Sequence, residues 1–208
     1  MALTTSSTSS TPRHLSAAEC EAFWRDGYLV VENALTPAEL GALQREFEGW
    51  VTDSRQHDKP WGIIADGRPR FDLEPGHTAE KPALRRVNSP TEISENYDRV
   101  MSESRVPMLI ADLIGPNIKF HHAKINSKLP GAATLVKWHQ DFPFTPHSND
   151  DLVTALIFVD EVTAENLEAL DKAGVAFRLT LPHRRFHRRI GIYAEHFFAP
   201  DGSPVSAE

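Results

Sequence analysis

The chain has little cysteine and no long apolar run. Its 208 residues include one cysteine, Cys20, which excludes an internal disulfide and is typical of a reducing compartment such as the cytoplasm. No stretch approaches the roughly 20 apolar residues that cross a bilayer, so we expect no membrane partner. Residues 1–12 are rich in Ser and Thr without an apolar core, which is not typical of a secretory signal.

Positive charge is also scarce. The formal net charge is −7, whereas a nucleic-acid-binding surface would be basic, so we expect no nucleic-acid partner. An apolar fraction of 40% and a charged fraction of 25% are typical of a soluble globular protein, and the length fits one domain. Residues 1–14 are predicted to form a disordered tail because their composition is polar.

Helix signals dominate the first half of the chain. Helices are predicted over residues 16–27, 36–51 and 94–114. Ser16 followed by Glu19 is typical of a capping box, and Thr36 before Pro37 of a helix start. Pro107 is predicted to bend the third helix or to begin a second one.

Strand signals dominate the second half. Strands are predicted over residues 28–31, 118–127, 134–139 and 152–159. Residues 52–90 are rich in Pro, Gly, Asp and Arg without a clear period, and we predict a long loop there. Short helices followed by strands indicate an α+β domain built on a sheet sandwich.

One pair of residues points to chemistry. His139 and Asp141 are two positions apart between strand-like runs, and side chains at that spacing on a strand lie on the same face. They supply two of the three ligands of an iron site made by two histidines and a carboxylate. Taken alone, the pair fits equally a surface loop with a hydrogen-bonded histidine.

Several motifs in combination resemble the phytanoyl-CoA dioxygenase family. They are FWRDGY (23–28), LIGPN (113–117), HAK (122–124), WHQDFPF (138–144), FVD (158–160) and TAEN (163–166). The resemblance implies a double-stranded β-helix (jelly roll), the cofactors Fe(II) and 2-oxoglutarate, and hydroxylation of a small organic substrate by O2. It also implies that His139 and Asp141 are catalytic metal ligands and that Asn126, on the preceding strand, helps to hold 2-oxoglutarate. For Asn126 the alternative is a turn residue at the end of a strand.

The resemblance covers residues 15–166 and then stops. The family's distal histidine and its later arginine are not recognisable, and residues 178–189 form a strongly basic run instead. The third iron ligand is therefore His183, His187, His196 or none. We expect a jelly roll that is incomplete at its C-terminal end, with 167–208 as a divergent segment; a frameshift or an internal deletion in the gene would explain the break.

Three functions remain open at this point. The first is an Fe(II)/2-oxoglutarate-dependent dioxygenase. The second is a catalytically inactive remnant or binding protein of the same fold. The third is a metal-independent jelly-roll binder, for which His139 would be dispensable. His121 and His122 are predicted to be strand residues, with lining of the site as the alternative.

Overall fold

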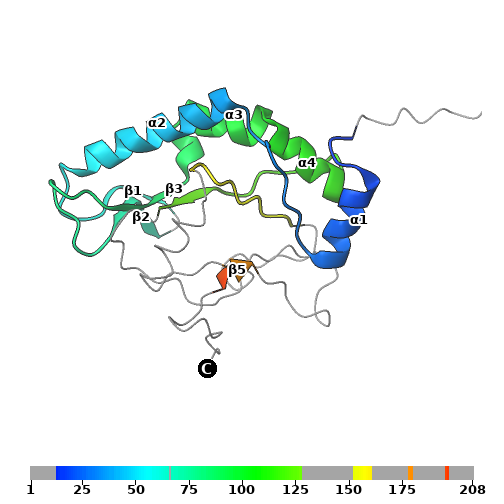
Figure 1. Ribbon diagram of the computed structural model, residues 1–208. Coiled ribbons are helices and arrows are strands. Elements are labelled where there is room, and N and C mark those ends of the chain that lie inside the picture. The colour runs from blue at the N-terminus through cyan, green and yellow to red at the C-terminus, as the bar shows by residue number, and fades with distance from the viewer. Residues whose placement is uncertain (1–12, 66, 128–151, 161–177, 180–194, 197–208) are drawn as a thin grey trace, which may run out of the picture.

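The computed structural model describes residues 13–65, 67–127, 152–160, 178–179 and 195–196 (Figure 1). The helices are α1 (Ala17–Asp26), α2 (Pro37–Ser54), the 3-10 turn η1 (Pro90–Glu92), α3 (Glu95–Glu103) and α4 (Arg105–Ile114). The strands are β1 (Trp61–Ala65), β2 (Arg68–Leu73), β3 (Leu84–Asn88), β4 (Lys124–Asn126), β5 (Arg178–Leu179) and β6 (Glu195–His196). Within these ranges, no helix is both long and apolar enough to cross a bilayer.

The first two helices begin at the predicted residues, a capping box at Ser16 and an N-cap at Thr36. The Ser16 hydroxyl accepts the Glu19 backbone N–H at 3.2 Å, and the Glu19 carboxylate accepts the Ser16 N–H at 2.7 Å. Thr36 and Glu39 repeat both bonds at the start of α2. Each glutamate carboxylate accepts from both the hydroxyl and the backbone N–H of its cap residue, and these bonds lower the pKa of both glutamates because they favour the charged form. Gly27, with φ of 84°, ends α1 in the left-handed conformation that glycine adopts readily.

The predicted helix over 94–114 is divided in two, as Pro107 indicated. Ser104 separates α3 from α4, and its hydroxyl accepts the N–H of Val106 at 3.1 Å. Pro107 is the third residue of α4, where the missing N–H has no partner within the helix. The prediction of a second helix is therefore confirmed, with its boundary at a serine cap.

The prediction of a long loop over 52–90 is wrong. This region contains β1, β2 and β3, which join β4 in an antiparallel sheet of order β1-β2-β3-β4. Register shifts interrupt the pairing of β1 with β2 and of β2 with β3, so no long regular alternation is visible in the sequence. The α+β class is confirmed by this sheet and the helices beside it.

Helices cover one face of the sheet. Figure 1 shows α2, α3 and α4 on the same side of the four strands. One row of paired residues on that side consists of Trp61, Phe71, Val87 and Ile125. Trp50 of α2 contacts the Phe71 ring, with 6.0 Å between centroids, and stacks on Tyr97 of α3 at 5.4 Å. This aromatic layer forms the core between helices and sheet.

One predicted strand is not a strand in the structure, and another is shorter than predicted. Residues 28–31 have no strand partner among the described residues; Leu29 and Val31 pack against buried Leu15 and Leu109 instead. Of residues 118–127, only Lys124–Asn126 is a strand. Leu29 and Val31 are partly buried without backbone pairing, which composition alone does not distinguish from a strand.

The segment 152–160 also differs from its prediction. It contains an isolated bridge at Leu152 and no strand. Ile157 and Val159 pack against the core of α2 and α3, and the Gln44 side chain donates to the Val159 carbonyl at 2.8 Å. Figure 1 shows the segment, in yellow, beneath these helices. The predicted strand over 134–139 lies outside the described residues.

Candidate functional site

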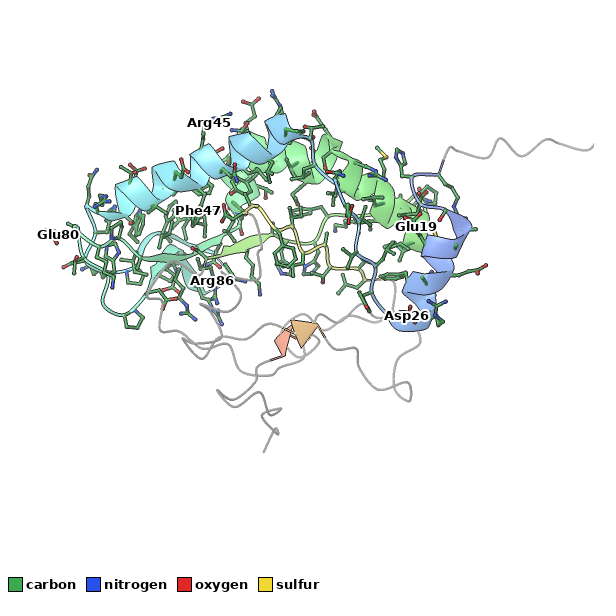
Figure 2. The ribbon with its side chains drawn as sticks, in the orientation of Figure 1. Glu19, Asp26, Arg45, Phe47, Glu80 and Arg86 are labelled. Carbon is green, nitrogen blue, oxygen red and sulfur yellow. The ribbon has the colours of Figure 1, made fainter. Side chains whose placement is uncertain are left out.

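The sheet has a polar face on the side away from the helices. We call the row Asp72, Arg86 and Asn126 the polar row, because these residues pair in register across β2, β3 and β4. Arg86 precedes the fully buried Val87, so alternation directs it to the side opposite the helices. Figure 2 shows Arg86 on that side, whereas Phe47 lies between α2 and the sheet.

Asn126 lies at the end of β4 and its side chain is exposed on the polar face. Its amide oxygen accepts a hydrogen bond from Nε of Arg86 at 3.1 Å. That bond fixes which end of the amide faces the arginine. The amide NH2 group has no acceptor within the part of the chain that the structure describes. It can therefore donate to a carboxylate or carbonyl of a ligand.

Arg86 was not identified from the sequence. Its side chain is half-buried, and burial lowers the pKa of its guanidinium, with the like charges of Arg85 and Arg68 acting in the same direction. The nearby carboxylate of Asp72 acts to raise this pKa, but its Oδ2 is already paired with Nη1 of Arg85 at 3.1 Å. The only sequence signal that could have pointed to Arg86 was the pair Arg85-Arg86, and it lies in a stretch that resembled a loop. The polar row taken together with the neighbouring Arg85 and Arg68 thus carries net positive charge.

The predicted iron ligands His139 and Asp141 lie outside the described residues, as do His183 and His187. Of the candidates for the third ligand, His196 has a described backbone, which pairs with Arg178 in the two-stranded β5–β6 sheet. The described residues contain no cluster of three or more His, Cys, Asp or Glu side chains that could hold a metal. An imidazole and a carboxylate, as in His139 and Asp141, are donor types that fit Fe(II).

His121 and His122, predicted to be strand residues, precede β4 instead. Both side chains are exposed, and their rings meet at 4.8 Å in an edge-to-face arrangement. Their Nδ1 atoms are 2.5 Å apart, so one ring donates to the other. The structure pairs these two histidines with each other and does not place them in the polar row.

Comparison with known proteins identifies several relatives. A probable alpha-ketoglutarate-dependent hypophosphite dioxygenase from Stutzerimonas stutzeri is 37% identical over 106 residues, covering 50% of this chain and 36% of that protein. An ectoine dioxygenase from Streptomyces coelicolor is 32% identical over 141 residues, covering 68% of this chain and 42% of that protein. The chain therefore spans less than half the length of these relatives.

Another match is higher in identity but much shorter. Benzoyl-CoA oxygenase component B from Aromatoleum evansii is 51% identical over 35 residues, which cover 17% of this chain and 7% of that protein. So small a share of either protein does not assign a family. No solved structure gives a significant match.

The family itself is shown by its sequence profile. The profile described as Phytanoyl-CoA dioxygenase (PhyH) matches residues 23–166, which is more than half of the chain. The match contains Asn126, His139 and Asp141, and it ends where the sequence motifs stopped. The resemblance inferred from the motifs is thereby confirmed: the chain belongs to the phytanoyl-CoA dioxygenase family.

Proposed function

We propose that the chain is an Fe(II)/2-oxoglutarate-dependent dioxygenase-like protein whose parent reaction is hydroxylation of a small organic substrate by O2. The observation that carries the proposal is the family match over residues 23–166. The named relatives support it, because both are dioxygenases and one is called alpha-ketoglutarate-dependent. An antiparallel sheet with helices on one face and polar residues on the other is consistent with one wall of a jelly roll.

In this proposal, residues 15–166 form the dioxygenase-like domain, 1–14 a tail and 167–208 a divergent segment. His139 and Asp141 hold Fe(II), which supplies O2 activation and the oxidative decarboxylation of 2-oxoglutarate. Asn126 contributes hydrogen bonding to 2-oxoglutarate. Its amide is suited to this role, since the oxygen is occupied by Arg86 and the NH2 group remains available as a donor.

A second candidate function is an inactive remnant or binding protein of the same fold. It is favoured by one observation: the family match ends at residue 166, and the segment after it carries no recognisable distal histidine and arginine. An intact site has three protein ligands for iron and a cation for the far carboxylate of 2-oxoglutarate. The two candidates differ in whether residues 167–208 complete such a site.

Anaerobic calorimetric titration with Fe(II) tests the proposal. We expect weak binding that is lost in His139→Ala, because two protein ligands chelate less strongly than three. His14→Ala is the matched control, since His14 is exposed and only its backbone forms hydrogen bonds in the structure. Iron binding that is unchanged by His139→Ala would contradict the assigned ligands, and tight binding that His187→Ala abolishes would identify the third one.

A further inference from the structure

Arginine outnumbers carboxylate around the polar row. The positive charges of Arg85 and Arg68 lower the pKa of the Arg86 guanidinium, while among the described residues the carboxylate of Asp72 acts to raise it. Asp72 is paired with Arg85, at 3.1 Å between Oδ2 and Nη1. The positive charge of Arg86 is consequently left without a carboxylate partner among the described residues.

The hydrogen bonding of Arg86 is correspondingly incomplete. Its Nε donates to the neutral amide oxygen of Asn126 at 3.1 Å. Its two terminal nitrogens have no acceptor within the described ranges. A half-buried cation in this situation is destabilised by lost hydration, which is the main cause of the lowered pKa of its guanidinium.

Arg70, a structural arginine in the same sheet, has different partners. Arg70 is almost fully buried, and it donates to the carbonyls of Asn88 at 3.1 Å and Ser89 at 2.6 Å. It also forms an ion pair with Glu92 at 2.5 Å. The terminal nitrogens of Arg70 thus have two backbone acceptors and a carboxylate, whereas its buried Nε has no partner among the described residues. Within the described ranges, Arg86 has neither backbone acceptors nor a carboxylate partner, so the packing seen there does not account for it.

We propose that Arg86, oriented by Asn126, binds an oxyanion group of a small ligand. The terminal edge of a guanidinium presents two parallel N–H donors, which match a carboxylate or phosphate-type group in a bidentate pair. Asn126 is a positioning residue for this contact, because its amide oxygen holds the Nε side of the same guanidinium. An anion here restores the charge balance that Asp72 does not supply to Arg86.

The oxyanion-binding role of Arg86 is argued from geometry, but the identity of the ligand rests on the proposed function. One source of the oxyanion is a carboxylate of 2-oxoglutarate, and the other is an anionic substrate. The two share the chemistry that Arg86 recognises, but they differ in competition. An anion that belongs to the cosubstrate site is displaced by 2-oxoglutarate, whereas one in a substrate site binds alongside it.

The test is calorimetric titration of the full chain without iron, using inorganic phosphate and 2-oxoglutarate as separate probes. We expect Arg86→Gln to weaken binding of at least one probe about tenfold or more, as loss of a charge-assisted bidentate pair implies. Arg86→Lys should weaken probe binding less, because lysine keeps the positive charge and loses only the two parallel N–H donors of the guanidinium. Arg99→Gln is the control, since Arg99 is exposed on α3 and pairs only with Glu95 in the described structure.

The outcomes separate clearly. Phosphate binding that depends on Arg86 and persists in saturating 2-oxoglutarate assigns the contact to an anionic substrate. Displacement by 2-oxoglutarate assigns it to the cosubstrate. If the wild-type chain binds neither probe, or if Arg86→Gln and Arg86→Lys both match Arg99→Gln, the proposal is overturned. Because iron is absent, this failure differs from loss of His139-dependent iron binding, which would overturn the proposed function.

Discussion

At the scale of single residues, the conformation of edge strand β1 requires a glycine at position 62. It has φ of +88°, and a Cβ built there would lie 2.8 Å from Cβ of Arg70. The pairing of β1 with β2 shifts register between Trp61 and Ile64, which is where Gly62 lies. A residue with a side chain would strain the backbone and displace Arg70, whose guanidinium bridges to η1.

Gly62→Ala is therefore expected to lower the free energy of unfolding by about 1–3 kcal/mol. Gly49→Ala is the matched control, because Gly49 lies in α2 with open space around its Cβ position, and alanine there should be neutral or stabilising by up to about 1 kcal/mol. Urea unfolding followed by tryptophan fluorescence measures both. Equal stability of the two variants would contradict the strain argument.

The His77 side chain joins two segments of the chain. Its Nδ1 accepts the Ala83 N–H at 2.8 Å, so the neutral ring carries its proton on Nε2. That Nε2 lies 3.0 Å from the carbonyls of Ser54 and His57, to which it donates. The end of α2 and the connection between β2 and β3 are thus held together by one imidazole.

His77→Ala is expected to destabilise the chain by about 1–3 kcal/mol, the usual cost of leaving partly buried backbone groups unpaired. His14→Ala should have little effect, since the His14 ring makes no hydrogen bond within the described residues. Hydrogen exchange is the sharper measurement. The Ala83 amide should exchange faster in His77→Ala, and unchanged protection would contradict the assigned bond.

At the scale of elements, helix ends were predictable and strands were not. The capping box at Ser16 and the N-cap at Thr36 are local signals, readable within four residues, and the structure confirms both. The strands β1 and β2 pair across a short connection, with Ala65 opposite Arg68, whereas the pairing of β3 with β4 joins segments far apart in the chain. Their polar row and bulges remove the simple alternation that would have revealed them.

The capping box of α2 has a pH signature. Hydrogen bonds from Thr36 lower the pKa of Glu39, so its stabilising effect is complete above the carboxyl's unfolded pKa and is lost as pH falls through the lower folded value. Thr36→Ala should cost about 0.5–2 kcal/mol at neutral pH, and less once Glu39 is protonated. Urea unfolding between pH 7 and 3 measures this, with Thr36→Ser as the control that keeps the cap. A cost independent of pH would contradict the linkage.

At the scale of the whole molecule, the site divides into a part that structure describes and a part that sequence predicts. Asn126 was found from the family motifs, and the structure adds its bond to Arg86. Arg86 could not be found from sequence, because its meaning depends on the register of β3 with β4 and on Asp72 being paired elsewhere. His139 and Asp141 remain predictions from their spacing and from the family.

Turnover of 2-oxoglutarate tests whether these parts make an active whole. We expect succinate release at or near background, because a bidentate cation for the far carboxylate and a third iron ligand are both needed, and residues 167–208 carry neither in recognisable form. The assay compares the chain with His139→Ala under identical Fe(II) and O2. Iron-dependent succinate release that His139→Ala abolishes would contradict this expectation. It would mean that a histidine such as His187 and one of the later arginines complete the site, and single substitutions there would then identify them.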